Sequence, residues 1–384
     1  MRARLVALPN VRIDRKAVRH IDFWLLGAMI ALEILSLPLI DSATHGADGH
    51  YYLKRQLVMI AVSSVALVVG TFVDYRDLIR MSPWLFGANV VLLLSLRFIG
   101  KTVGGSTRWI PLGVFDLQPS ELQKIVTILF TARMLRSKET YHDSWWDLLP
   151  IYAWMVVPIV LILWQPDLGT AISIAVIGTG VIYFSGTPGK VILSLVALGM
   201  VAVLIVLGLY WFAGLPLPIE QHWVDRIVSA FNPEKDPLGL GYQVLQSKIA
   251  IGSGGLWGKG LGQGTQNRLD FIPEQQTDFI FSVVGEELGF VGTLCVLSLY
   301  ALIVYRCLIV AIGSLDKEGT LVAGGVFTML LFQVLVNVGM TMGIMPVTGI
   351  PLPFLSYGGT ALIVNAFCVG LVLNVSWKRH KILF

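Results

Sequence analysis

The sequence predicts an all-α, polytopic membrane protein with ten transmembrane helices and a large extracytoplasmic loop before the eighth helix. Three observations support this class. Hydrophobic residues make up 55% of the 384 residues, charged residues make up only 14%, and apolar runs of bilayer-spanning length recur along the chain. Because the polar segments between these runs are too short to fold alone, we treat residues 1–384 as a single transmembrane domain.

The apolar runs set the positions of the ten helices, since a helix that crosses a bilayer needs about 20 residues. The predicted spans are residues 22–40, 56–73, 83–99, 119–135, 147–164, 168–185, 190–213, 278–305, 319–344 and 360–377. Most of the 28 Lys and Arg residues fall on one side of the membrane when the N-terminus is placed in the cytoplasm. The basic cluster from Arg2 to Arg19 is part of this bias, so we predict that both termini are cytoplasmic.

Charge and cysteine content disfavour several functions. The net charge of +4 follows from the positive-inside bias and requires no nucleic-acid partner. The three cysteines, Cys295, Cys307 and Cys368, lie in or beside apolar spans, with neither a disulfide pattern nor a metal-ligand spacing. The N-terminus has no short apolar core followed by a small-residue cleavage site, so we expect the first span to be retained.

Residues 214–277 form the one long polar segment, and the topology places it outside the cytoplasm. Its aromatic residues and prolines predict short interfacial helices joined by rigid turns. Its second half is rich in glycine and carries Lys259 and Arg268, with Lys248 just before it. Such a loop can lie close to a ligand, with backbone N–H groups and cations facing an anion.

Charged residues within apolar spans are the strongest functional signal, because each costs about 2.5–3.5 kcal/mol at a helix centre unless it is paired or hydrated. Glu121 and Lys124 lie three residues apart in the fourth span, so they can pair on one helix face. The pair can serve helix packing or face a substrate, and the sequence leaves both roles open. Asp167 lies at an outer helix start, where it can act as a simple cap or join the same site.

Three acidic residues belong to the eighth span. Asp278 is predicted to start the helix at the water boundary. Glu286 and Glu287 follow roughly 12–14 Å deeper. On a straight helix their directions differ from that of Asp278, so the three cannot share one site. We expect Glu287 to bond to a neighbouring helix.

Two further outer segments carry polar groups suited to a phosphate or sugar. Residues 104–109 form a flexible loop that presents Arg108 beside an interfacial tryptophan. Residues 356–360 offer the Ser356 hydroxyl and free amides at the start of the last span. Polar clusters on one membrane side predict an outward-facing site, and we find no metal-ligand spacing or nucleotide-binding loop.

These segments resemble a known family. Residues 273–289, preceded by 250–255 and 258–262, closely resemble the SEDS family of bacterial cell-wall polymerases, and residues 349–359 match a second hallmark of that family. The resemblance covers essentially the whole chain, and residues 262–274 are more similar to elongation-type members than to division-type members. Thr360 stands where a serine is common, and it keeps the hydroxyl.

The resemblance implies a peptidoglycan glycosyltransferase of the bacterial cytoplasmic membrane that polymerises lipid II at the outer face for cell elongation and rod shape. It implies an inverting reaction that forms β-1,4 linkages and releases undecaprenyl pyrophosphate, with Asp278 as the catalytic base. The expected partners are a class B penicillin-binding protein and other elongation-complex proteins.

Several points stay open at this stage. Arg108, Lys248, Lys259 and Arg268 are the cations expected to stabilise the pyrophosphate, and a divalent cation such as Mg²⁺ or Mn²⁺ can share that task. The rival functions are a lipid II flippase, whose path the intramembrane charges would line, a non-catalytic scaffold for the transpeptidase, and a division-type polymerase.

Overall fold

A computed structural model of the protein describes residues 22–44, 50–103, 106–113, 115–136, 145–213, 239–269 and 271–381. Each predicted span coincides with a helix. The helices are α1 (Phe23–Ala43), α2 (Tyr51–Phe72), α3 (Tyr75–Ile99), α4 (Pro119–Leu135), α5 (Trp145–Leu163), α6 (Leu168–Phe184), α7 (Gly189–Ala213), α11 (Ile280–Ile312), α12 (Lys317–Thr341) and α13 (Gly359–Lys381). The basic cluster from Arg2 to Arg19 lies outside the described residues.

Within the described part of the chain, seven of these helices are long and apolar enough to cross a membrane. They are α1, α2, α3, α5, α11, α12 and α13. Helices α4 and α6 have 17 residues each, and α4 carries the Glu121–Lys124 pair. The protein is therefore a helical, multi-pass membrane protein, and the exact count of ten spans stays a prediction.

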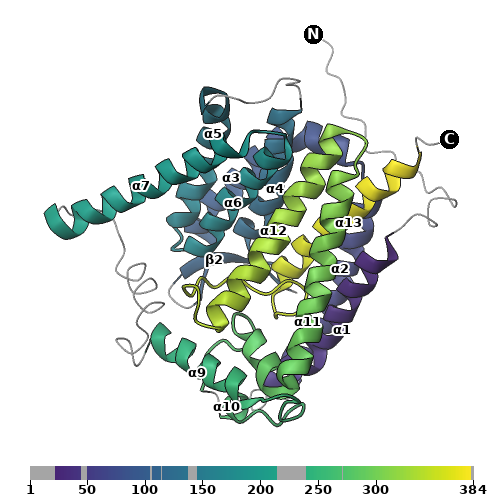
Figure 1. Ribbon diagram of the computed structural model, residues 1–384, viewed down its shortest axis with the longest axis vertical. Coiled ribbons are helices and arrows are strands. Elements are labelled where there is room, and N and C mark those ends of the chain that lie inside the picture. Colours follow the sequence, from purple (N-terminus) through teal and green to yellow (C-terminus); the bar gives the residue numbers. More distant parts are fainter. Residues whose placement is uncertain are drawn as a thin grey trace.

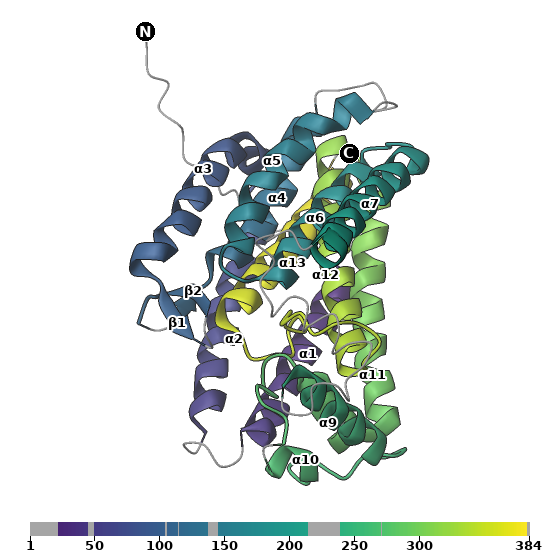
Figure 2. The same ribbon diagram turned by 90° about the vertical axis from the view of Figure 1, so that its left-hand side faces the viewer.

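The helices pack as one bundle around an apolar core (Figure 1). Helix α13 packs on α2, and α11 packs on both α12 and α1, while α4 joins α3 to α6. Helix α7 leans away from the bundle and follows α6 (Figure 1). Two short helices, α9 (Leu240–Ser253) and α10 (Thr265–Arg268), lie across one end of the bundle. The C-terminal end of α13 is at the opposite end (Figures 1 and 2). The first part of the polar loop, 214–238, is outside the described residues.

A small sheet modifies the expectation of an all-α fold. The segment predicted as a flexible loop around Arg108 forms three antiparallel strands, β1 (Lys101–Val103), β2 (Ser106–Pro111) and β3 (Asp116–Leu117), in the order β1-β2-β3. Its threonines and valine favour extended backbone, but the strands are too short to stand out from a loop in the sequence. Because β2 contacts both α3 and α4, the sheet holds Arg108 in a fixed position.

Helix α11 begins later than predicted and is bent. Its first residue is Ile280 and its N-cap is Phe279, so Asp278 lies in the preceding turn and does not cap the helix. The bend is at Gly289, whose φ of 66° lies in the left-handed region that favours glycine. This break frees the carbonyls of Glu286 and Glu287, which accept hydrogen bonds from the amides of Lys259 (3.0 Å) and Gly260 (3.0 Å). The glycine-rich loop is thus bound to α11 at these amides, where an anionic ligand had been expected.

Candidate active site

A cavity of about 430 Å³ opens where the small sheet, α2, α4, the start of α6 and the turn before α11 meet. It has both polar and aromatic lining groups, including Trp109, Phe115 and Tyr357. Its charged lining residues are Arg55, Arg108, Asp116, Glu121, Asp167, Glu274 and Asp278. The structure therefore brings together four of the predicted site residues, Arg108, Glu121, Asp167 and Asp278, from separate parts of the sequence.

Asp278 is half-buried at this cavity, and its backbone is held on both sides. Its amide donates to the carbonyl of Glu274 (3.1 Å), and its carbonyl accepts from Nδ2 of Asn337 on α12 (2.9 Å). The same Nδ2 donates to the carbonyl of Ile350 (2.8 Å), so Asn337 joins the Asp278 turn to the chain on the other side of the cavity. A carbon atom added at Gly349 would lie 3.4 Å from Oδ2 of Asp278, so the chain at Gly349 passes directly beside this carboxylate.

Arg108 projects from β2 and is fixed by backbone carbonyls. Its Nε donates to the carbonyl of Gln165 (2.9 Å), and its Nη2 donates to that of Pro166. Its Nη1 lies 3.9 Å from Oδ2 of Asp167. Asp167 caps α6, because its carboxylate accepts from the amide (3.1 Å) and the hydroxyl (2.9 Å) of Thr170. The main contacts of Asp167 are thus those of a helix cap, and its carboxylate also lies near the Arg108 guanidinium.

Glu121 and Lys124 form a buried ion pair, with Lys124 Nζ 2.6 Å from Oε1 of Glu121. The other carboxylate oxygen of Glu121 is buried without a hydrogen-bond partner in the described part of the protein. Glu121 lines the cavity, whereas Lys124 lies behind it. The pair thus joins two residues of the same helix, and Glu121 is the member that borders the cavity, so its role toward a substrate stays a prediction.

The other predicted binding residues do not line this cavity. Lys259 pairs with Glu286 (2.7 Å), and Ser356 Oγ accepts from the amide of Leu352 (2.8 Å) within a turn. Lys248 and Arg268 are exposed on α9 and α10. Sequence proximity to Asp278 does not bring these cations to it, because the loop folds back onto the α11 bend.

The two glutamates of α11 anchor the loop. Glu286 accepts from the Lys259 ammonium and from the amide of Gln266 (3.0 Å), while Glu287 accepts from Nδ2 of Asn267 (3.0 Å) and from the hydroxyl of Ser42. Because Ser42 lies on α1, Glu287 bonds to a neighbouring helix, as predicted. Both carboxylates are buried and engaged on the loop side.

The sequence analysis did not select several cavity residues, among them Arg55 and Tyr357. Arg55, on the second turn of α2, bonds through Nη1 to the Tyr51 hydroxyl (2.9 Å), and a cation at a span end reads as an interfacial anchor. Tyr357 follows Ser356, and its backbone N–H donates a hydrogen bond to the carbonyl of Gln276 (2.9 Å). Burial raises the pKa of Tyr357, partly opposed by Arg55, so its hydroxyl stays neutral at pH 7 and can donate a hydrogen bond.

The comparisons with known proteins give the family. The family model described as "Cell cycle protein" (FTSW_RODA_SPOVE) matches residues 18–381. The peptidoglycan glycosyltransferase MrdB of Escherichia coli K12 is 38% identical over 94% of this chain and 95% of its own length. Stage V sporulation protein E of Bacillus subtilis is 37% identical over 92% of this chain and 96% of its own.

Solved structures of related proteins have the same fold. A chain of a peptidoglycan synthase complex, in a study of how polymerisation and crosslinking are coordinated, has a TM-score of 0.78 and 32% identity, covering 94% of this chain and 99% of its own. The rod shape-determining protein RodA of Thermus thermophilus has a TM-score of 0.69 and 29% identity, covering 94% of this chain and 98% of its own. The chain therefore belongs to the SEDS family, which includes FtsW, RodA and SpoVE.

Proposed function

We propose that the protein is a peptidoglycan glycosyltransferase that polymerises lipid II during cell elongation. The observation that carries this proposal is the cavity in which a half-buried carboxylate, Asp278, lines the same space as two guanidinium groups, Arg55 and Arg108. Glycosyl transfer from a lipid pyrophosphate needs a base for the acceptor and cations for the leaving group. The relatives named as peptidoglycan glycosyltransferases support the same activity.

Asp278 acts as the general base in this proposal. The 4-hydroxyl of the acceptor's terminal GlcNAc attacks the anomeric carbon of the donor MurNAc, and Asp278 takes the hydroxyl proton. A β-1,4 bond forms with inversion as the bond to undecaprenyl pyrophosphate breaks, and both electrons of that bond leave with the pyrophosphate. The Asn337 bridge keeps the Asp278 turn in place beside Gly349 throughout this step.

Arg55 and Arg108 stabilise the charge that develops on the leaving pyrophosphate. The carbonyl contacts of Arg108 position it before substrate arrives, so less reorganisation is needed in the transition state. Within the described residues no group of three His, Cys, Asp or Glu side chains gathers. A divalent cation in this scheme would take its oxygen coordination mainly from the pyrophosphate and water, and Asp278 stays free to accept the proton.

The proposed orientation places both termini in the cytoplasm and the cavity at the outer face of the bacterial cytoplasmic membrane. A class B penicillin-binding protein is the proposed partner, with its membrane helix packed on α11 and α12 and its outer stalk on the loop before α11. The related chain that was solved in a peptidoglycan synthase complex supports such a partner.

The flippase alternative needs charges along a path through the membrane. The contacts of Glu286 and Glu287 argue against it, because Glu286 binds the loop and Glu287 binds both the loop and the end of α1. Lys124 is also closed off by Glu121. The charged residues that line the active-site cavity all lie near one end of the bundle.

The test is to incubate the purified protein with lipid II in detergent, with and without the transpeptidase partner, and to measure glycan strands. Our proposal predicts glycan strands, and it predicts one free undecaprenyl pyrophosphate for each disaccharide unit that is transferred. In a parallel assay in liposomes, movement of lipid II across the bilayer without any polymer would instead support the flippase. Lack of both activities in the complex would support the scaffold.

A further inference from the structure

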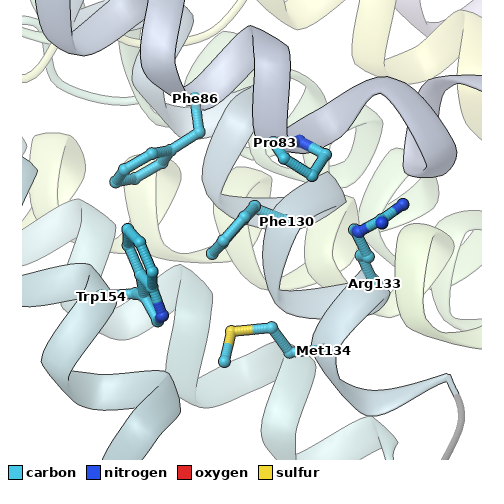
Figure 3. A pocket seen from close by; sticks show the side chains of 6 residues that line it. All are labelled: Pro83, Phe86, Phe130, Arg133, Met134 and Trp154. Carbon is cyan, nitrogen blue, oxygen red and sulfur yellow. The ribbon is translucent and has the colours of Figure 1, made fainter. Parts of the chain in front are cut away.

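A second cavity, of about 350 Å³, lies between α3, α4 and α5, away from the active-site cavity. Its lining residues are Pro83, Phe86, Phe130, Arg133, Met134 and Trp154 (Figure 3). Arg133 and Glu121 are twelve residues apart on α4, which separates the two cavities by roughly 18 Å along the helix axis. Its volume is within the range of about 300–1,000 Å³ that is typical of small-molecule sites.

The apolar wall of this cavity is built from three aromatic rings. Phe86 stacks on Phe130 with ring centroids 4.9 Å apart, and Trp154 meets both edge-on, at 5.6 Å and 5.5 Å. Pro83 has no N–H for the carbonyl of Ile79, which accepts instead from the Ser82 hydroxyl (2.9 Å). Since Trp154 stays 47% exposed on a membrane helix, this wall opens toward lipid.

Arg133 is the one charged residue among the lining side chains. Its Nη1 donates to the carbonyl of Arg80 on α3 (2.8 Å), which holds the guanidinium at the cavity. Neighbouring cations have acidic partners: Arg80 pairs with Asp77 (3.1 Å) and Arg136 with Glu318 (3.4 Å). Arg133 has no such carboxylate among the described residues.

One structural role for Arg133 is to stabilise α4, because a cation near a helix C-terminus interacts favourably with the helix dipole. Its hydrogen bond to the Arg80 carbonyl also joins α4 to α3. That role uses one of five N–H donors. Arg133 is two residues from the end of α4, so its remaining donors are near the depth at which lipid phosphates occur. An unpaired cation above an aromatic, lipid-facing wall has the charge and shape for one anionic phospholipid, whereas the membrane helix of a partner would bury that cation against apolar residues.

We propose that this cavity is a binding site for a single anionic phospholipid, with the phosphate on Arg133 and an acyl chain along Phe86, Phe130 and Trp154. The Arg133 contact is a charge-assisted hydrogen bond, which gives preference for an anionic headgroup. The bound lipid joins α3, α4 and α5 and so stabilises the flank of the bundle that carries Glu121.

The test is native mass spectrometry of the full-length protein, purified in detergent and titrated with phosphatidylglycerol or phosphatidylcholine of the same acyl chains. We expect one tightly retained phosphatidylglycerol, and about tenfold weaker retention in Arg133→Gln. Arg133→Lys should keep the preference in part. Arg136→Gln, at the C-cap of α4, should keep it fully. Thermal unfolding without lipid shows that each variant is folded.

A phosphatidylglycerol with a photoactivatable acyl chain tests the apolar half of the site. Crosslinks should fall on the peptides around Phe130 and Trp154 in the parent protein and decline in Arg133→Gln. Equal retention of both lipids, or unchanged phosphatidylglycerol binding in folded Arg133→Gln, would overturn the proposal. Loss of the transpeptidase from Arg133→Gln with unchanged lipid binding would assign the cavity to a partner helix instead.

Discussion

The Glu121 carboxylate and the Lys124 ammonium are almost completely buried, so each offsets much of the cost of burying the other. We predict that Lys124→Met or Glu121→Gln alone destabilises the protein by about 3–5 kcal/mol, because each change leaves the other residue as a buried charge without a partner. The double variant should lose less than the sum of the two single losses. Thermal unfolding of the three variants at matched lipid content measures this.

The same cycle carries its own control. Additive losses of stability would show that the two side chains act independently, despite the 2.6 Å separation of their charged atoms. Activity is a separate readout, since Glu121 lines the cavity and Lys124 does not. If Glu121 serves only to pair with Lys124, the double variant should recover activity together with stability.

Single residues were harder to predict than their chemistry suggested. Asp278 could be selected because its motif is specific, and the cavity does contain it. Lys259 has the right charge for a pyrophosphate, yet it bonds to Glu286. Arg55 resembles an ordinary interfacial cation and lines the cavity through the packing of α2 in the bundle, mainly on α13. A side chain's partner is set by tertiary contacts that local sequence does not encode.

At the scale of elements, the loop before α11 is anchored by the Glu286 carboxylate. We predict that Lys259→Met lowers stability by about 3 kcal/mol, the lower end of the range for broken buried pairs, because Lys259 is 26% exposed. Hydrogen exchange at residues 258–268 should increase, while the KM for lipid II stays unchanged. The exposed Arg268→Gln is the control and should change neither quantity. A raised KM with unchanged exchange would make Lys259 a substrate ligand.

The close contact between the loop and the α11 bend gives a sharper test. A Cβ at Gly258 would lie 2.1 Å from the carbonyl oxygen of Glu287, and the φ of Gly258 is +79°. Gly258→Ala should therefore destabilise the protein by more than about 2 kcal/mol, from both the clash and the backbone strain.

The matched control is Gly252→Ala on α9, where an added Cβ meets nothing within 4 Å. That change should be neutral or stabilising by up to about 1 kcal/mol. Chemical or thermal unfolding of both variants compares them directly. Similar stability of Gly258→Ala and Gly252→Ala would mean that the loop does not hold to α11 as described.

Elements were predicted best where one physical force dominates. Hydropathy predicted ten spans, and a helix lies at each of them, because a long apolar run must satisfy its backbone within a helix. The strands β1 to β3 were missed because two to six residues carry little periodicity. The start of α11 was placed two residues early, since an Asp before an apolar run looks like a cap.

For the whole molecule, the bundle creates one polar cavity where segments far apart in sequence converge. The family resemblance and the composition were enough to predict the membrane class and the catalytic candidate. They named Arg108 as one of four candidate cations but missed Arg55, because the cations at the cavity depend on how the sheet packs on α3 and α4 and how α2 packs on α13. The activity that we propose thus depends on Asp278 as the base, while the other residues of the cavity bind and position the substrate.

The central claim is tested most directly by lipid II polymerisation with purified Asp278→Asn in complex with its transpeptidase partner. Asparagine keeps the size and most hydrogen bonds of aspartate but cannot accept the proton. We predict a fall in rate of about 10²–10⁴-fold, with thermal stability and partner binding unchanged, because a positioned base contributes that much. A folded Asp278→Asn complex that makes glycan strands at a near-normal rate would contradict the account.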